Sequence, residues 1–171
     1  MPPTRALLTR ELLTDPSPRM LAVAAGGGSA ALLAGALFFQ ALGFAPCELC
    51  ILQRWPHAAA AALAVAIAAL GFRRLLAVLG LIAALLAVAF AAYHTGVEQA
   101  WWPGPAACSG GLGDLGAVST EELLSRIRGA QVVRCDQPAW VFLGLSMAAW
   151  NAILSAGLAG LWALSLRRSA R

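Results

Sequence analysis

Hydrophobic residues in this chain form long runs, without the regular polar interruptions that mark the surface helices and strands of a soluble domain. Four runs stand out, at residues 20–42, 50–70, 75–93 and 140–166. Each is close to the roughly 20 residues that an α-helix needs to cross the hydrocarbon core of a bilayer. The pattern therefore predicts an all-α membrane protein, a bundle of four transmembrane helices.

The polar segments between these runs are short connections and one long loop. The sequence predicts a tail at residues 1–19, a loop at 43–49, a turn at 71–74, a long loop at 94–139 and a second tail at 167–171. The first run is longer than the 7–15-residue apolar core of a signal peptide, so we expect a retained helix. Pro56 lies in the early turns of the second run and predicts a kink or a later regular start there.

Composition supports the membrane prediction and narrows the choice of partners. Of the 171 residues, 60% are hydrophobic and 12% are charged, which is more apolar surface than one soluble domain of this length can bury. The net charge of +4 comes from arginine alone, because the chain contains no lysine. These arginines do not form a basic stripe interleaved with aromatic residues, so we expect no nucleic-acid partner.

The distribution of arginine predicts the orientation of the bundle. The first tail, the 71–74 turn and the C-terminal tail carry three, two and three arginines, eight in all. By the positive-inside rule, these segments and both termini should be cytoplasmic. Residues 43–49 and 94–139 then face the outside, which in a bacterium is the periplasm, where disulfides persist. All four cysteines lie in or beside these two outer segments.

The most informative stretch is Pro46-Cys47-Glu48-Leu49-Cys50, which lies between the first two runs and hence at the membrane edge. Two thiols separated by two residues can close into a disulfide or open into a dithiol, which makes the pair a natural redox couple. If a helix starts near Cys50, the N–H groups at its N-terminus favour the thiolate. Arg54 lies one turn further on the same face, and a fixed cation there also favours the thiolate of Cys50.

Other interpretations of these residues stay open at this point. A C-x-x-C pair is also typical of half a zinc site, which here would draw on His57 and His94. The pair could instead be a structural disulfide, although a transmembrane bundle has little need of one. Arg54 taken alone could be an interfacial arginine whose guanidinium reaches the lipid headgroups.

The long outer loop carries the second cysteine pair, Cys108 and Cys135. Between them, residues 119–122 fit the S-x-x-E capping box, and three apolar residues follow on one helix side, Leu123, Leu124 and Ile127. We expect a short amphipathic helix there, lying on the membrane surface or packed on the bundle. Glycines after Cys108 should let the loop move enough to present one sulfur to a partner.

Two cysteine pairs at one interface, one anchored on a helix and one in a movable loop, suit a relay of thiol–disulfide exchanges. The obvious two-electron acceptor beside the bilayer is a quinone. In these features the chain resembles the bacterial disulfide bond formation protein B family, DsbB, over nearly its whole length. The matching residues are Pro46-Cys47-x-x-Cys50 with Arg54, His94 at the outer end of the third run, Cys108, Cys135, and Phe142-Leu143-Gly144-Leu145-x-Met147-x-x-Trp150.

The resemblance implies a four-helix bundle that reoxidises the periplasmic dithiol oxidase DsbA and reduces ubiquinone, or menaquinone in some lineages. It implies that Cys108 forms the mixed disulfide with DsbA and that Cys135 passes the electrons to Cys47. Cys50, as a thiolate, would contact the quinone, with Arg54 stabilising the charge. The same resemblance puts His94 near the quinone and implies no metal.

The implied location is the bacterial inner membrane, with the cysteines facing the periplasm. A bundle like vitamin K epoxide reductase, which carries out related quinone-linked chemistry, is the competing enzyme interpretation. The spacing of the outer cysteines and the motif that opens the fourth run favour DsbB. The family gives no role to His57, so we interpret it as an interfacial histidine.

Overall fold

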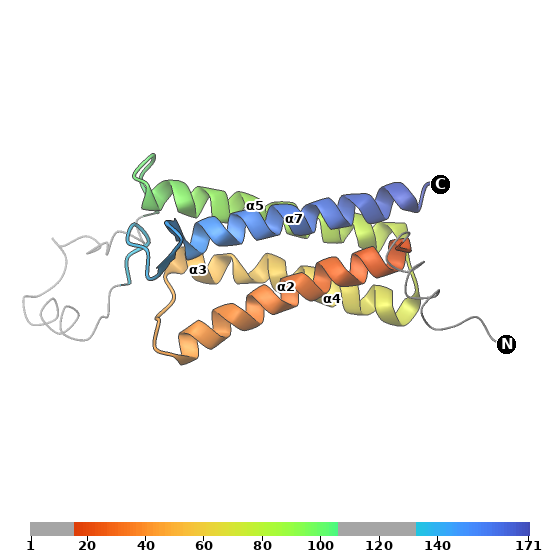
Figure 1. Ribbon diagram of the computed structural model, residues 1–171, viewed down its shortest axis with the longest axis horizontal. Coiled ribbons are helices and arrows are strands. Elements are labelled where there is room, and N and C mark those ends of the chain that lie inside the picture. Colours follow the sequence, from red (N-terminus) through yellow and green to blue (C-terminus); the bar gives the residue numbers. More distant parts are fainter. Residues whose placement is uncertain (1–15, 106–132) are drawn as a thin grey trace, which may run out of the picture.

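Four long helices lie side by side in the computed structural model, which describes residues 16–105 and 133–171 (Figure 1). The elements in chain order are α2 Pro18–Ala41, α3 Glu48–Leu52, α4 Arg54–Leu70, α5 Arg74–Glu98, β1 Val141–Phe142, β2 Leu145–Ser146 and α7 Met147–Arg168. Four segments are long and apolar enough to cross a membrane, namely α2, α3 with α4, α5, and α7. The prediction of a four-helix membrane bundle is confirmed.

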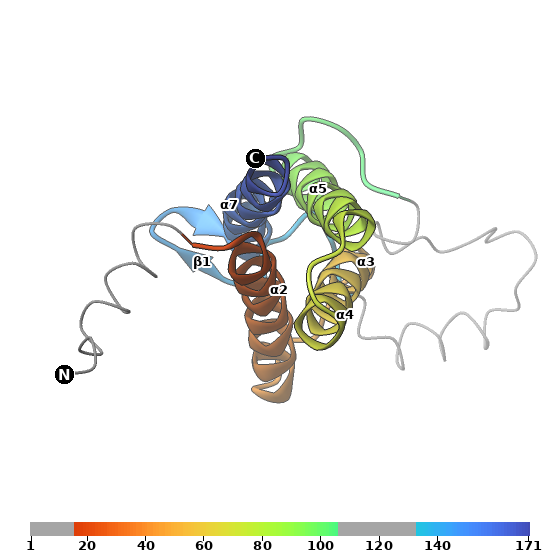
Figure 2. The same cartoon turned by 90° about the vertical axis from the view of Figure 1, so that its right-hand side faces the viewer.

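The end-on view in Figure 2 shows how the helices surround the core. Helix α2 packs against α4 and α7, and α5 packs against the same two helices, so each long helix has two main neighbours. Figure 1 places α3 and the β1–β2 hairpin at one end of the bundle. The turn between α4 and α5, the start of α2 and the last turn of α7 lie at the other end.

The second membrane span is interrupted at Gln53, between α3 and α4. Pro56 has no backbone N–H, so the carbonyl of Leu52 cannot receive the usual helical hydrogen bond from it. The chain therefore ends one short helix at Leu52 and starts another at Arg54. The helix also begins earlier than the predicted Cys50, because Cys47 caps α3 with its own sulfur.

The third and fourth spans differ from the predicted boundaries at their cysteine-side ends. Helix α5 continues through His94 to Glu98, because both side chains are buried among polar partners and need no solvent. Residues 141–146 form a two-stranded hairpin where the apolar run had suggested helix. Its two turn residues, Leu143 and Gly144, have φ of 52° and 79°, which is the geometry of a tight hairpin turn.

Small residues let the helices approach closely at the end away from the cysteines. The buried core there contains alanines from all four long helices, together with Ile67 and the fully buried Trp162. A methyl group added at Gly26 would lie 2.0 Å from Cβ of Ala64 on α4, and one at Gly80 would lie 2.6 Å from the ring of Trp162. Both distances are shorter than Cβ contacts in proteins, so a side chain at either position would force its neighbour to move.

Two sequence predictions fall outside the described residues. These are the capping box at 119–122 with the amphipathic helix that it starts, and the placement of Cys108.

Replacing Gly26 tests the close approach of α2 and α4. The change Gly26→Ala should lower the free energy of unfolding in detergent by about 1–3 kcal/mol, because the backbones must separate to admit one methyl group. The matched control is Gly27→Ala, since a methyl group at Gly27 meets no described atom within 4 Å. Equal stability of the two variants in a denaturant titration would contradict this helix packing.

Candidate redox site

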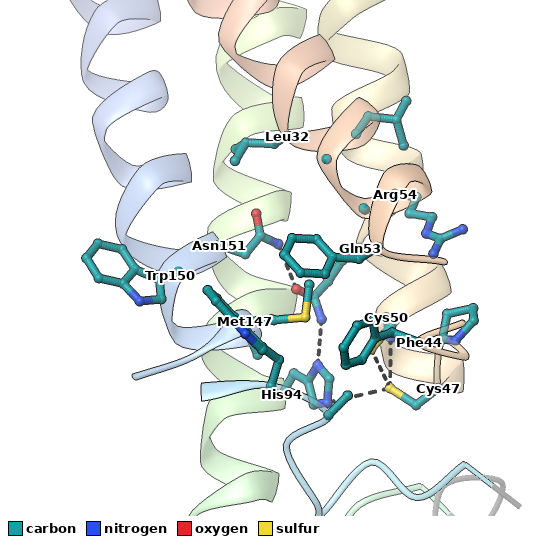
Figure 3. Close-up of a pocket in the computed structure, with 18 of the residues that line it drawn as sticks. Leu32, Phe44, Cys47, Cys50, Gln53, Arg54, His94, Met147, Trp150 and Asn151 are labelled. Atoms are coloured by element: carbon teal, nitrogen blue, oxygen red, sulfur yellow. Dashed lines mark hydrogen bonds between the residues drawn. The ribbon is translucent and has the colours of Figure 1, made fainter. Parts of the chain in front are cut away.

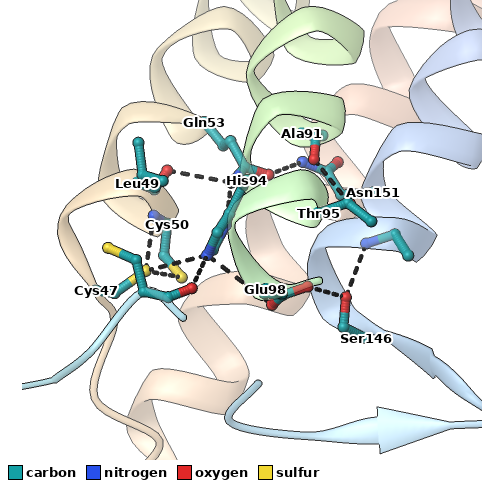
Figure 4. Close-up of polar contacts among 12 residues, drawn as sticks. Cys47, Leu49, Cys50, Gln53, Ala91, His94, Thr95, Glu98, Ser146 and Asn151 are labelled. Atoms are coloured by element: carbon teal, nitrogen blue, oxygen red, sulfur yellow. Dashed lines mark hydrogen bonds and ion pairs between the residues drawn. The ribbon is translucent and has the colours of Figure 1, made fainter. Parts of the chain in front are cut away.

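The C-x-x-C pair forms the start of α3 (Figure 4). Cys47 is the N-cap residue, and its Sγ accepts a hydrogen bond from the backbone N–H of Cys50 at 3.2 Å. Both cysteines carry free thiols, and their sulfurs lie 2.7 Å apart. Cys47 is buried and Cys50 is half-buried, so the second sulfur is the more accessible one.

The two thiols are not equivalent. The S–H of Cys47 is oriented to donate to the sulfur of Cys50. This hydrogen bond, together with burial, raises the pKa of Cys47 above its ordinary value. Cys47 therefore keeps its proton, while Cys50 receives a hydrogen bond and lies in the first turn of a helix, where negative charge is favoured. On this asymmetry we keep Cys50 as the predicted thiolate of the pair.

A cavity of about 290 Å³ opens beside Cys50 (Figure 3). Its walls are mainly apolar and come from every long helix, with Leu32 and Phe39 from α2 and Met147 and Trp150 from α7. The connections before α3 and before α7 complete the wall with aromatic side chains, Phe44 and Trp140. The polar groups that line the cavity include both thiols, Arg54 and His94. The cavity has the character of a site for a flat apolar ligand with polar ends.

Arg54 lies on the cavity wall and is held there from α2. One guanidinium nitrogen, Nη1, donates to Oε1 of Gln40 at 2.6 Å. Its Nε is buried and has no hydrogen-bond partner among the described residues. A guanidinium that keeps donor capacity at the edge of an apolar cavity is suited to an anionic or carbonyl ligand.

His94 lies at the centre of the site, 3% exposed, with both ring nitrogens engaged (Figure 4). Its Nδ1 is 2.7 Å from Nε2 of Gln53. Its Nε2 is 3.2 Å from the backbone carbonyl of Cys135 and 3.6 Å from Sγ of Cys47. The ring thus connects the first cysteine pair to the segment that carries the second.

The hydrogen-bond partners identify the tautomer of His94. The Gln53 amide nitrogen also donates to the carbonyl of Leu49 at 3.2 Å, so the amide oxygen cannot occupy that side. Nδ1 must then accept from Gln53, and the ring proton must sit on Nε2, where the Cys135 carbonyl accepts it. The carbonyls of Leu49 and Cys135 can only accept hydrogen bonds, so both require this orientation of the Gln53 amide and this tautomer of His94.

Cys135 is the other cysteine that the structure describes, and it is fully buried and disulfide-bonded. It belongs to the same buried cluster as Cys47, Leu49 and Val97. The cluster brings together two cysteines that are far apart in sequence, which the spacing alone could not predict. Next to it, the guanidinium of Arg134 binds Asp136 and holds the pKa of that exposed carboxyl below its usual range.

The arrangement also bears on the metal interpretation. Cys47, Cys50 and His94 place three potential ligand atoms within 4.8 Å of one another. His57 is not part of this group; its Nε2 instead bonds Oδ1 of Asn151 at 2.9 Å. A metal on Nε2 of His94 would have to displace the proton that the Gln53 contact places there. The donor set fits a metal only if this network is rearranged, so we favour the redox interpretation.

Several polar residues of the site were missed by the sequence analysis: Gln40, Gln53, Glu98, Ser146 and Asn151. Each is a polar residue within or next to an apolar run, which in a membrane protein is itself a signal of function. Ser146 shows the pattern well, because its hydroxyl caps α7 and also donates to the carboxylate of Glu98.

Comparison with known proteins now assigns the chain. A sequence model of the family described as disulfide bond formation protein DsbB matches residues 18–165. The chain belongs to the DsbB family. This confirms the resemblance seen in the sequence and supports disulfide bond formation as the function of the protein.

The relatives cover most of the chain. A disulfide bond formation protein B from Xanthomonas oryzae pv. oryzae (strain MAFF 311018) is 36% identical over 148 residues, 83% of this chain and 86% of the relative. One from Xanthomonas euvesicatoria pv. vesicatoria (strain 85-10) is 37% identical over 142 residues, 79% of this chain and 81% of the relative. No solved structure matches the chain.

The inequivalence of the two thiols can be tested by chemical labelling. In the protein with Cys47 and Cys50 reduced, iodoacetamide at neutral pH should label Cys50 about tenfold faster than Cys47, because the thiolate is the nucleophile. Peptide mapping by mass spectrometry measures both rates in one sample. Equal labelling under native conditions would contradict the assignment, whereas equal labelling after denaturation is the expected control.

Proposed function

We propose that this DsbB family member reoxidises a DsbA-type dithiol oxidase and passes the two electrons through its two cysteine pairs to a membrane quinone. The observation that carries the proposal is the cavity against Cys50 and Arg54, which joins a reactive sulfur to an apolar site within reach of the bilayer. Family membership supplies the disulfide chemistry, and the cavity suggests the acceptor.

The residues around the cavity fit a quinone. Its volume of about 290 Å³ is at the lower end of the range for small-molecule sites and suits a substituted ring whose tail leaves toward lipid. Cys50, Arg54 and His94 would hold the ring, with aromatic and aliphatic side chains on its faces. A bound quinone supplies an acceptor for two electrons and two protons. Ubiquinone and menaquinone both meet this description.

The electron path follows the two pairs. The partner's thiolate attacks Cys108 of the Cys108–Cys135 disulfide, and the pair of electrons leaves on Cys135. Cys135 then attacks Cys47 of the Cys47–Cys50 disulfide, and the electron pair leaves on Cys50. The presence of Cys135 and Cys47 in one buried cluster supports this second step. The partner's second thiolate then displaces Cys108 from the mixed disulfide, which leaves the partner oxidised, and Cys108 displaces Cys47 from Cys135. Each exchange breaks one S–S bond and forms another, so the two electrons and two protons of the partner end on Cys47 and Cys50, from which a bound quinone would take them.

Arg54 has an electrostatic role in this proposal. Its charge persists at any working pH, and it faces both the thiolate of Cys50 and the charge that develops on the acceptor. Both charges lie at a water-poor site, where a fixed cation stabilises them more than it would in bulk water. Gln40 holds one side of the guanidinium, and Arg54 lines the cavity.

Orientation in the membrane follows from the arginines. The structure describes several of them at the end opposite α3, where Arg19 donates to the carbonyl of Ala68 and Arg168 donates to that of Pro16. We infer that this end is cytoplasmic and that the cysteine end faces the periplasm, as the positive-inside rule requires. The membrane is then the bacterial inner membrane, where quinones and a periplasmic oxidase are both accessible.

The proposal is tested by turnover with purified components. A reduced DsbA-type partner should be oxidised by this protein only when ubiquinone or menaquinone is present, with one quinone reduced per partner. Cys108→Ser should abolish capture of a partner that lacks its second active-site cysteine, whereas Cys47→Ser should still capture it. Oxidation that proceeds without quinone, or capture by the Cys108→Ser protein, would refute the assigned path.

Substitution of Arg54 separates an electrostatic role from membrane anchoring. Arg54→Met should lower kcat/KM for quinone by about 100-fold, because the stabilising charge is lost. Arg54→Lys keeps the charge but loses the planar fork, so we expect a defect of about tenfold, mainly in KM. Gln40→Leu should reproduce part of the Lys defect. If Arg54→Lys has the same kcat/KM for quinone as the unmodified protein, Arg54 serves only as a membrane anchor at the lipid headgroups.

A further inference from the structure

A continuous chain of hydrogen-bonded side chains runs through the interior from His57 to His94, and Figure 4 shows its Asn151–Gln53–His94 part. It begins at His57 on α4, passes through Asn151 on α7 to Gln53 at the break before α4, and ends at His94 on α5. Its heavy-atom distances are 2.9, 2.7 and 2.7 Å. Three of the four long helices contribute to it, and His57 and Gln53 are both buried.

Every link in this chain has the same polarity. The amide nitrogen of Gln53 faces two acceptors, so its oxygen faces Asn151 and accepts from Nδ2 of that residue. The oxygen of Asn151 is then left to accept from Nε2 of His57 and from the hydroxyl of Ser155. Donors therefore all point from His57 toward His94, and reversal of the Gln53 amide would bring like groups together at both of its ends.

We propose that Gln53 and Asn151 are positioning residues that hold His94 with its proton on Nε2 and direct that proton at the junction of Cys47 and Cys135. The proposal rests on the proposed electron path and adds Gln53 and Asn151 to the residues that this path uses. Gln53 acts on His94 directly, and Asn151 acts by preventing the Gln53 amide from turning over.

The proton on Nε2 of His94 acts at one step of the proposed electron path. After Cys135 has joined Cys47, Cys108 attacks Cys135 to re-form the outer disulfide, the Cys47–Cys135 bond breaks, and its electron pair stays on Cys47. Cys47 is buried, with 4% of its surface exposed, so a thiolate there needs a donor. Nε2 of His94 lies 3.6 Å from that sulfur, 3.2 Å from the Cys135 carbonyl and 3.9 Å from Oε1 of Glu98. The proton therefore stabilises the leaving sulfur at the point where the two pairs separate.

A structural role and a positioning role of Gln53 and Asn151 predict opposite changes in the alkylation rate of Cys47. In a Cys50→Ser background with the outer disulfide intact, Cys47 is the one free thiol, and its alkylation rate at fixed pH reports its thiolate fraction. If Gln53 and Asn151 only support packing, their loss should loosen the site and expose Cys47, which then reacts faster. If they position His94, their loss should make Cys47 react more slowly.

We expect Gln53→Met to slow the alkylation of Cys47 about tenfold, which corresponds to the loss of about one hydrogen bond. Asn151→Leu should slow it less. Ser155→Ala is the matched control, because Ser155 bonds the same Asn151 oxygen but lies outside the path to His94. In a His94→Phe background, Gln53→Met should have no further effect, since both changes remove the same contact. Nitrogen-15 NMR should place the His94 proton on Nε2 in the parent protein.

Faster alkylation in Gln53→Met, additive effects with His94→Phe, or a proton on Nδ1 of His94 would each overturn the proposal. Neither measurement uses the partner or a quinone. Failure of turnover in the unmodified protein would therefore count against the proposed function, while failure here would count against the positioning role alone.

Discussion

A polar side chain inside a membrane bundle must find its partner within the bundle, because lipid tails and packed alanines offer none. This constraint shapes the cysteine end of the protein. His94 on α5, Gln53 at the break before α4, Asn151 on α7 and His57 on α4 form one chain, in which each side chain bonds the next. The continuation of α5 to Glu98 has the same origin, since the carboxylate bonds the hydroxyl that caps α7. The polar contacts thereby fix how the helices are arranged around the cavity.

The two ends of the bundle are held together by different interactions. At the end away from the cysteines, glycine and alanine bring helix backbones together around Trp162, and the interior is filled. At the cysteine end, α2 contributes Leu32 and Phe39 to the wall of a cavity and Gln40 to the support of Arg54. Close packing at one end and polar contacts at the other allow a cavity without loss of a defined helix arrangement. The reactive pair lies where these polar contacts meet.

Much of the fold and of the candidate site could be predicted from the sequence. The rest could not, and the reasons are physical. The lengths of the apolar runs predicted the spans, and the C-x-x-C with Arg54 predicted the reactive pair beside a helix start. The hairpin at 141–146 was missed because its residues are as apolar as a membrane helix, and only backbone geometry at Leu143 and Gly144 distinguishes it. Gln53 and Asn151 were missed because they are 98 positions apart, and their meeting depends on helix rotation that hydropathy does not encode.

The break at Gln53 has a consequence for the working cycle of the reactive pair. A disulfide and a dithiol need different spacings between their sulfurs, so α3 must adjust each time the pair changes state. A continuous helix would pass that adjustment down its hydrogen-bond ladder into the membrane. Here the ladder is interrupted before α4, because Pro56 offers no N–H to Leu52. The short helix α3 can therefore shift with each change in redox state of the cysteine pair, while α4 keeps its position.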